Sequence, residues 1–450
     1  MRLKRIKRST KKGVIHSLGC KVNQIETESV AQLMRELGFE LDQSTDQPDL
    51  IFINTCCVTG RAEAKSRRFV GRIAKTFPQS RIMVSGCLAE LKPDDLRSLG
   101  PNIECLGTFQ KNNLGENCAF FLNTSTTSSS WKSCDCLNFG SLPTPVSQAR
   151  SRAFLKIQDG CSQRCSYCIV PSTRGPSRSM DLEKAVRDLA SLERADYPEI
   201  VLTGIHLGAY GRDLEPATTL DAFVVKALSQ LKSSRLRLSS IEPQEISDSL
   251  IEMVSRDGRL CKHFHIPFQS LDDKILQLMG RPYGFEKLNE LVRKILKMIP
   301  TVCIGADIMV GFPGEDEDSF KFTYDALGDL GLAYLHVFPF SPRPGAPASK
   351  MNGIPNSKIV SHRVSELRKL SARLRGDFYK KFIGCELEAC LEAGSATNSG
   401  QVLARTNNYI LAELDESRDI PPKRLFKIVI ESSINGTAKA RLSRSLGQLP

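Results

Sequence analysis

The feature that most constrains this 450-residue chain is a loop with three cysteines. Residues 160–168 read GCSQRCSYC, so Cys161, Cys165 and Cys168 follow a Cys-x3-Cys-x2-Cys spacing. Zinc sites built from one chain usually pair two Cys-x2-Cys knuckles, and no fourth ligand of that style lies nearby. Three thiolates without a local fourth ligand fit a [4Fe–4S] cluster with one open iron, and three incidentally clustered thiols are the alternative.

Strand-like and helical segments alternate around this loop. Six segments between about residues 150 and 345 have strand character, namely AFLKIQ, EIVLTG, LRLSSI, KHFHIPF, CIGADIMVG and LAYLHVFPF. This repetition predicts an α/β fold with a full or partial parallel barrel. The cysteine loop follows the first of these strands, and the active sites of such barrels lie at the carboxyl ends of their strands.

The first 120 residues show the same alternation in a shorter form. We expect strands at 14–18, 49–55 and 81–86, in a parallel sheet with helices at 25–38, 61–77 and 93–99. Cys20, Cys56 and Cys87 each lie just past the end of one of these strands. The carboxyl ends of parallel strands share one crevice, so the pattern predicts a second three-thiolate site. A buried structural cysteine is the alternative for each one alone, and Cys57 is expected to be structural.

The remaining segments complete a five-part organisation. We expect a basic tail at 1–12, the first α/β domain at 13–121, a Ser/Thr-rich linker at 122–147, the barrel domain at 148–378 and a C-terminal domain at 379–447. A helix is expected over 356–382. The last domain contains short alternating runs such as CELEACLEA and FKIVIESS, which predict a small antiparallel β-barrel.

Composition narrows the class of protein. The net charge of +12 and the pI near 9.0 favour a polyanionic partner, with a basic but non-binding surface as the alternative. No apolar run is long enough to span a membrane, and the basic N-terminus lacks the apolar stretch of a secretory signal. We therefore expect a cytoplasmic protein. Because thiols stay reduced in the cytoplasm, any special role of its 15 cysteines is expected to be metal binding or catalysis and not disulfide formation.

The chain resembles the methylthiotransferase family of radical S-adenosylmethionine (SAM) enzymes over nearly its whole length. The Cys-x3-Cys-x2-Cys loop is typical of radical SAM enzymes. The other motifs that carry the resemblance are LGCKVNQIETE (18–28), INTCCVT (53–59), VSGC (84–87), FLKIQDGCSQRCSYCIVPSTRGPSRS (154–179), IVLTGIHLGAYG (200–211), HFHIPFQS (263–270), DIMVGFPGE (307–315) and HVFPFSPRPGAPA (336–348).

The resemblance implies an architecture and a reaction. It implies an N-terminal auxiliary-cluster domain, a partial radical SAM barrel and a C-terminal TRAM domain, which is an OB-like β-barrel that binds RNA. Cys161, Cys165 and Cys168 would hold the [4Fe–4S] cluster that cleaves SAM, and Cys20, Cys56 and Cys87 would hold a second one. No catalytic residue is expected beyond these cluster ligands.

The motifs GCKVNQ-x-E-T-E and TGIHLG most resemble those of enzymes that act on N6-threonylcarbamoyladenosine in tRNA. The implied reaction is methylthiolation of C2 of that base at position 37, beside the anticodon. The alternatives are isopentenyladenosine-37 in tRNA, a ribosomal-protein aspartate, or, in a different class, a non-catalytic iron–sulfur RNA-binding protein. An electron donor such as a flavodoxin or ferredoxin system and a sulfur donor are implied as partners.

Several further residues are candidates for binding the cofactor or RNA. Candidate cofactor-binding residues lie in TGIHLG, SSIEP and VGFPGE: Thr203, Gly204, Gly208, Glu242, Gly311 and Gly314. Arg174 and Arg178 are expected to bind a phosphate, the cofactor carboxylate or a nearby acidic side chain. A basic stripe at helical spacing is expected to contact tRNA phosphates, with a solvated face as the alternative: Arg61, Lys65, Arg68, Arg72 and Lys75. The C-terminal barrel is expected to position the anticodon arm of the tRNA.

Overall fold

The computed structural model describes residues 11–114, 138–392, 402–414, 420, 423–434 and 436–443. These residues fall into two compact units. The first unit runs to Pro145 and includes Asp159–Ser162 and Cys168–Arg178 of the cysteine loop region. The second contains Val146–Gln158, Gln163–Tyr167 and the residues from Ser179 onward.

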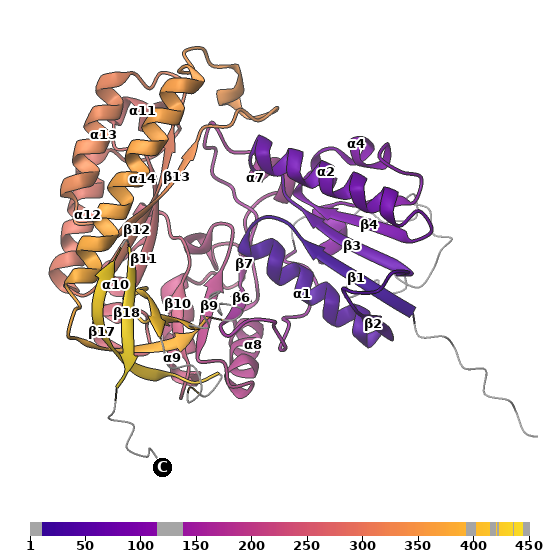
Figure 1. Ribbon diagram of the computed structural model, residues 1–450, viewed down its shortest axis with the longest axis horizontal. Helices are drawn as coiled ribbons and strands as arrows, with labels where there is room; N and C mark the ends of the chain where they lie inside the picture. Colours follow the sequence, from indigo (N-terminus) through magenta and orange to yellow (C-terminus); the bar gives the residue numbers. More distant parts are fainter. Residues whose placement is uncertain are drawn as a thin grey trace, which may run out of the picture. The chain divides into compact units, whose positions relative to one another are not determined.

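The first unit is built on a five-stranded parallel sheet with the order β2-β1-β3-β4-β5, of which Figure 1 labels β1 to β4. Its strands are β1 (Lys11–Ser17), β2 (Phe39–Leu41), β3 (Leu50–Thr55), β4 (Arg81–Gly86) and β5 (Ile103–Leu106). Its helices are α1 (Lys21–Glu36), α2 (Gly60–Thr76), α3 (Cys87–Leu91), α4 (Pro93–Arg97), α5 (Thr108–Asn112) and α7 (Val170–Arg174). The predicted parallel sheet is therefore confirmed, and the elements of this unit that the sequence did not predict are β2, β5, α3, α5 and α7.

Both faces of this sheet are covered because its strands are apolar on both sides. Ile51 and Ile53 pack with Val70 and Ile73 of α2 on one face. Phe52 lies on the other face in a cluster that contains residues of α1. The order 2-1-3-4-5 reverses direction between β1 and β3, and ligands of such sheets bind at the carboxyl ends beside that point.

The second unit contains six parallel strands in two sheets, β6-β9-β10 and β11-β12-β13. Isolated bridges from Leu236 to Leu260 and from Ser240 to His265 join the two sheets. The strands are β6 (Ala153–Lys156), β9 (Glu199–Thr203), β10 (Arg235–Leu238), β11 (His263–Gln269), β12 (Cys303–Val310) and β13 (Tyr334–Pro339). All six predicted strands are thus present, and the two sheets form a partial barrel.

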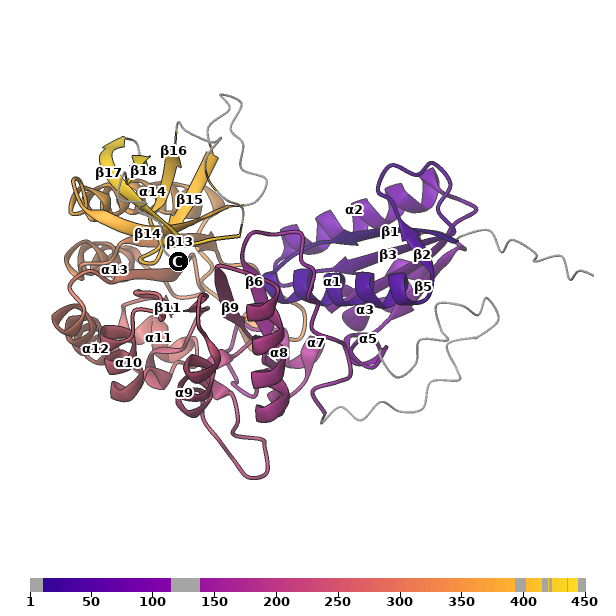
Figure 2. The same ribbon diagram turned by 90° about the horizontal axis from the view of Figure 1, so that it is seen from below.

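Helices follow these strands and cover the barrel; α8 and α9 lie side by side, and α14 packs along β13 with α13 next to it (Figure 2). They are α8 (Leu182–Arg194), α9 (Leu220–Gln230), α10 (Asp248–Arg256), α11 (Asp273–Leu278), α12 (Phe285–Met298), α13 (Glu317–Asp329) and α14 (Ser357–Lys380). Short elements complete the unit: β7 (Gln158–Asp159), β8 (Arg178–Ser179), η2 (Leu207–Ala209), η3 (Pro243–Glu245) and η4 (Pro347–Lys350).

The C-terminal segment forms a closed five-stranded barrel in the order β14-β15-β16-β18-β17. Its strands are β14 (Glu386–Leu391), β15 (Val402–Thr406), β16 (Leu411–Leu414), β17 (Phe426–Ile434) and β18 (Thr437–Leu442). The expected antiparallel arrangement is wrong for one pair, because β16 and β18 run parallel and close the barrel. Among the described residues, no helix is both long and apolar enough to cross a membrane.

Candidate functional site

Three cysteines of the first unit lie at the carboxyl ends of neighbouring strands. Cys20 is the N-cap of α1 after β1, Cys56 follows β3, and Cys87 begins α3 after β4. Burial, together with smaller contributions from the neighbouring thiols of Cys87 and Cys20, raises the pKa of Cys56 to about 11. The three thiols are therefore close enough to interact, and their role in binding a cluster stays a prediction.

Two glycines shape the backbone beside these thiols. Gly19 has a φ of 105°, and a side chain there would begin only 2.5 Å from the Cβ of Cys56. Gly86 has a φ of 92°, and its added Cβ would lie 2.3 Å from the carbonyl oxygen of Thr55. Both positions combine a left-handed backbone with close approach, so only glycine is accommodated without distortion.

A buried ionic network surrounds Arg174 in the same unit. Its guanidinium donates to Glu26 Oε1 at 2.9 Å, to Asp159 Oδ1 at 2.9 Å and to Asn23 Oδ1 at 2.6 Å. Lys111 is also fully buried and forms an ion pair with Glu26. Burial alone would lower the pKa of Arg174, but Glu26, Asp159 and the Cys87 thiol raise it well above its usual value.

This network decides among the roles expected for two arginines. Arg174 binds acidic side chains of the protein, which was one of the alternatives for it. Arg178 donates to the carbonyl oxygen of Arg174 at 2.9 Å, and its guanidinium lies 4.9 Å from the ring centre of Phe109. Both side chains are about 1% exposed. Their position favours a structural role in holding the region around the cysteines rather than contact with a phosphate.

The cysteine loop contributes residues to both units. In the first unit, Cys161 N donates to Gly175 O at 3.0 Å, and Cys168 Sγ accepts from Val170 N at 3.4 Å. In the second unit, Cys165 Sγ lies 3.5 Å from Nη1 of Arg281. All three cysteines are only partly buried, so their sulfurs are not locked in an apolar core.

Arg281 links Cys165 to the candidate cofactor residue Glu242. Its Nη1 lies 3.0 Å from Glu242 Oε2, while its Nη2 donates to Pro267 O at 2.9 Å. Burial raises the pKa of Glu242, and Arg281 lowers it by a smaller amount. Sequence reasoning missed Arg281, because it lies more than a hundred residues from the cysteine loop and outside the quoted motifs.

The candidate glycines and Thr203 have protein neighbours that account for their identity. Added side chains would meet Glu245 Oε2 at 2.1 Å from Gly208 and Val360 Cγ2 at 2.6 Å from Gly311. A Cβ added at Gly204 would lie 3.0 Å from Gln158, and one added at Gly314 would lie 3.2 Å from Leu278. The Thr203 hydroxyl donates to Val201 O at 3.4 Å. Their predicted roles in binding the cofactor stay predictions.

Orphaned polar atoms at the carboxyl ends of the barrel strands leave bonding capacity for a ligand. Gln269 ends β11 with a φ of 70°, and its buried Oε1 has no hydrogen-bond partner among the described residues. Ser239, just past β10, has a buried hydroxyl in the same condition. A strained residue with an unsatisfied buried polar atom is costly unless a ligand uses it, so this end of the barrel fits a polar cofactor.

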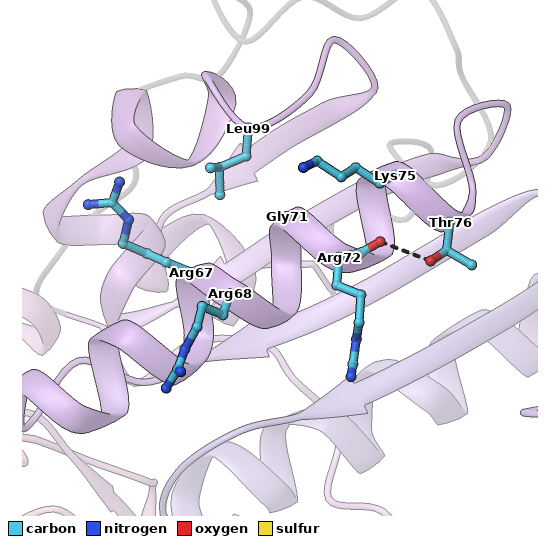
Figure 3. A pocket seen from close by; sticks show the side chains of 7 residues that line it. All are labelled: Arg67, Arg68, Gly71, Arg72, Lys75, Thr76 and Leu99. Carbon is cyan, nitrogen blue, oxygen red and sulfur yellow. Dashed lines mark hydrogen bonds between the residues drawn. The ribbon is translucent and has the colours of Figure 1, made fainter.

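The basic stripe forms the exposed face of α2. Its five predicted cations are all exposed, and Arg68 and Arg72 extend in the same direction from the helix (Figure 3). A groove of about 610 Å³ is lined by Arg67, Arg68, Gly71, Arg72, Lys75, Thr76 and Leu99. The one acidic residue of α2, Glu63, is paired with Lys92 at 2.8 Å, so it does not neutralise the stripe. The groove is therefore a cationic surface.

Among the other cysteines that the structure describes, all but the exposed Cys385 are buried. Cys57 is fully buried in the apolar cluster that contains Val70 and Ile82, as expected. Cys105, Cys261, Cys303 and Cys390 are buried as well. Cys118, Cys134 and Cys136 lie outside the described residues, as do most of the basic tail and the linker.

Comparison with known proteins agrees with this geometry. Residues 12–107 match the model of Uncharacterized protein family UPF0004, and residues 155–327 match that of the Radical SAM superfamily. Among solved structures, the fold is similar to a radical S-adenosylmethionine methyltransferase, TsrM, from Kitasatospora setae, with a TM-score of 0.51 and 13% identity over 75% of this chain and 74% of that one. It is also similar to the cobalamin-dependent S-adenosylmethionine radical enzyme OxsB, with a TM-score of 0.52 and 12% identity over 81% of this chain and 57% of that one.

The barrel and its cysteine loop define a radical SAM enzyme, which uses SAM and a [4Fe–4S] cluster. The chain is 34% identical to "Threonylcarbamoyladenosine tRNA methylthiotransferase MtaB" of Bacillus subtilis strain 168 over 90% of both chains. It is 32% identical to proteins of the same name from Aquifex aeolicus, over 84% of this chain and 92% of that one, and Rickettsia prowazekii, over 91% and 93%. The chain therefore belongs to the radical SAM methylthiotransferase family.

Proposed function

We propose that this enzyme methylthiolates C2 of N6-threonylcarbamoyladenosine at position 37 of tRNA, using SAM and two [4Fe–4S] clusters. The observation that carries the proposal is the second set of three thiols, Cys20, Cys56 and Cys87, at the switch point of the first unit's sheet. A simple electron carrier or RNA-binding protein would need neither a cofactor barrel nor two such sets. The relatives named for threonylcarbamoyladenosine support the choice of substrate.

The donor sets fit the two clusters. Cys161, Cys165 and Cys168 would hold one cluster and Cys20, Cys56 and Cys87 the other, each leaving one iron for a non-protein ligand. When bound, these groups supply one-electron cleavage of SAM and the sulfur to be inserted, because side-chain acid–base chemistry does not cleave an unactivated C–H bond.

The protein's own residues have positioning roles in this scheme. Arg281 places a cation beside Cys165 and holds Glu242 in one orientation by an ion pair. Glu242 then offers a carboxylate to the amino group of SAM, and Gln269 offers its unpartnered amide oxygen at the same end of the barrel. In the first unit, the Glu26–Arg174–Asp159 network ties α1, which Cys20 caps, to the residues just before and after the cysteine loop.

Nucleoside mass spectrometry tests the substrate. Deleting the gene should remove 2-methylthio-N6-threonylcarbamoyladenosine from tRNA and leave the isopentenyl counterpart unchanged. Reintroducing the wild-type gene is the control and should restore the product. Loss of the isopentenyl counterpart alone would move the enzyme to that substrate, and no change in either would make ribosomal protein the next acceptor to test.

The cationic face of α2 is proposed as a contact surface for tRNA phosphates, with the C-terminal barrel as a second, TRAM-type RNA-binding element. Arg61, Lys65, Arg68, Arg72 and Lys75 are exposed on α2. Electron and sulfur donors of the cytoplasm would complete the reaction.

Substitution of single cations on α2 should weaken tRNA binding without changing its specificity. For Arg68→Ala or Lys75→Ala, loss of one phosphate contact should lower the slope of log affinity against log salt by about one. Filter binding of tRNA over a range of salt concentrations measures this slope. Arg97→Ala is the matched control, because Arg97 is paired with Asp94 at 2.8 Å on α4. Equal slopes for all three variants and the wild type would refute the contact.

A further inference from the structure

A chain of hydrogen-bonded side chains crosses one face of β11, β12 and β13 in the second unit. Tyr334 Oη lies 2.9 Å from His263 Nε2 and 3.0 Å from His265 Nδ1. His265 Nε2 lies 2.9 Å from Asp307 Oδ1, and His336 Nδ1 approaches the same oxygen at 3.4 Å. The established chemistry of the cysteine loop uses none of these five residues.

This face is the inner face of the partial barrel. The strand registers pair His265 with Gly305, Gly305 with Tyr334, and Asp307 with His336, so these side chains share one side of the sheet. The opposite side carries Phe264, Ile266, Ile304, Ala306, Ile308 and Leu335, all of which are buried. Polar groups therefore line the inside while apolar groups face the covering helices.

Close packing fixes the buried end of the chain. An added side chain at Gly305 would lie 2.0 Å from the ring of Tyr334, so glycine is what lets this ring lie against the sheet. The ring of Tyr409 stacks on His263 at 4.1 Å, and the Arg237 guanidinium lies 5.1 Å from the centre of the Tyr409 ring. His263, His265 and Tyr334 are thus held as a rigid support.

The other end of the chain is open. The side chain of His336 is 57% exposed, that of Asp307 is 24% exposed, and that of His265 is 9% exposed. Burial alone would raise the pKa of Asp307, but His265 and His336 hold it below its usual range, so Asp307 is ionised. Because Nδ1 of His336 is turned to Asp307, its Nε2 is left to bond a polar ligand.

Asp307 and His336 lie farther from the cysteine loop than their neighbours toward the carboxyl ends of the same strands, as the N6 substituent of a bound adenine would. Met309 and Phe338 lie two residues nearer the carboxyl ends than Asp307 and His336, which is about 7 Å along a strand. They pack in the apolar cluster that contains Tyr167 of the cysteine loop. A base whose C2 faces that loop directs its N6 substituent away from it, because the C2 and C6 bonds diverge across N1.

We propose that His265, Asp307 and His336 form the subsite that binds the polar threonylcarbamoyl substituent of the substrate base. The inference rests on the proposed function and adds the residues that read the substituent. His336 Nε2 hydrogen-bonds the substituent's hydroxyl or carboxylate, and Asp307 with His265 holds His336 in place. Tyr334 is a positioning residue, since it acts through His265.

This subsite discriminates by leaving polar groups unpaired when the wrong base enters. An isopentenyl group offers no hydrogen bond to His336 or Asp307, and it would displace water from them without replacing the hydrogen bonds that this water makes. The same three side chains have ligand atoms within 4.8 Å of one another, which is also compatible with a divalent cation. We favour the substituent over a cation because one nitrogen of each imidazole, His265 Nε2 and His336 Nδ1, faces the same Asp307 oxygen at hydrogen-bond distance. A nitrogen that donates its proton in such a bond cannot ligate a metal at the same time.

Binding of matched RNAs tests the subsite. Anticodon stem–loops that differ only at position 37, carrying threonylcarbamoyladenosine, unmodified adenosine or isopentenyladenosine, are titrated with the full-length, cluster-loaded enzyme by fluorescence anisotropy. His336→Ala should weaken binding of the threonylcarbamoyl RNA about tenfold, which corresponds to one hydrogen bond to a charged group, and leave the unmodified RNA unchanged. His336→Gln, which keeps a polar atom near the Nε2 position, should restore part of the loss. His362→Ala, an exposed histidine on α14, is the control.

Three outcomes separate the proposals. Equal affinity of wild type and His336→Ala for the threonylcarbamoyl RNA, while the wild type still prefers and modifies it, overturns the subsite and leaves the function standing. A wild type that modifies only the isopentenyl RNA overturns both. Stoichiometric zinc in the wild type by elemental analysis, absent from His336→Ala, shows a metal site and overturns the subsite. An unchanged thermal unfolding curve by circular dichroism verifies that the variant is otherwise intact.

Discussion

A Cys56→Ala enzyme is expected to cleave SAM and yet form no methylthio product. Cys56 belongs to the thiol set of the first unit, whereas SAM cleavage is assigned to Cys161, Cys165 and Cys168. Losing one of three thiolates should empty the second site, so iron should fall from about eight to about four per chain. Iron analysis, 5′-deoxyadenosine formation and product formation on tRNA measure the three consequences on one preparation.

The neighbouring residue supplies a matched control. Cys57 is adjacent in sequence but fully buried among apolar side chains, so Cys57→Ala should keep its full iron content and form product. Cys165→Ala should instead lose both SAM cleavage and product. A Cys56→Ala enzyme with full iron and normal product would show that this thiol is not a ligand, and the proposal of a second cluster would fail with it.

The sequence predicts the strands of this protein well because each is a short apolar run bounded by turn residues. The six barrel strands and the three strands before Cys20, Cys56 and Cys87 all lie where the pattern places them. β2 and β5 are short and carry a charged residue at Glu40 and Glu104, so their strand signal is weak. The parallel pair β16–β18 depends on how the barrel closes, which no local pattern encodes.

The site was predictable only where motif and position coincide. The two cysteine sets can be proposed from the sequence, the first from its Cys-x3-Cys-x2-Cys spacing and the second because each of its thiols follows a recognisable strand end. Arg281 and the His265–Asp307–His336 group are not, because their meaning depends on strand register and on side chains brought together across long stretches of chain. For Arg174 the sequence left three partners open, namely a phosphate, the cofactor carboxylate or a nearby acidic side chain, and its buried partners Glu26 and Asp159 favour the last.

The largest stability effect is expected at Glu199, at the start of β9. Its carboxylate is fully buried and forms ion pairs with Arg152 at 3.0 Å, Arg235 at 2.8 Å and Arg237 at 2.7 Å. Arg235 and Arg237 also donate to backbone carbonyls of Arg405 and Thr406 on β15, so they attach the C-terminal barrel to the partial barrel. Glu199→Gln leaves these buried cations without their shared anion.

Removing one partner of a buried ion pair costs about 3–5 kcal/mol, and Glu199→Gln should lower the free energy of unfolding by that amount. Urea titration followed by circular dichroism measures it. Glu183→Gln is the control: Glu183 pairs with Lys226 on the surface, where such a pair contributes about 0.2–1 kcal/mol. Similar losses in both variants would mean that the guanidinium groups find other compensation, in Glu388 and Glu392 for example.

The pH dependence of this difference gives an independent check on the charge of Glu199. Burial alone would raise its pKa, but Arg237, Arg235 and Arg152 hold it well below the usual value. A carboxyl whose folded pKa is depressed contributes its full stabilisation above its unfolded pKa of about 4.3 and loses it as the pH falls toward the folded value. The gap in stability between wild type and Glu199→Gln should therefore be constant from about pH 7 to pH 5 and narrow below about pH 4. A gap that stayed constant through pH 3 would mean that Glu199 has the same pKa in the folded and unfolded states, and a gap that widened would mean that folding raises this pKa. Either result would contradict an ionised Glu199 held by the three arginines.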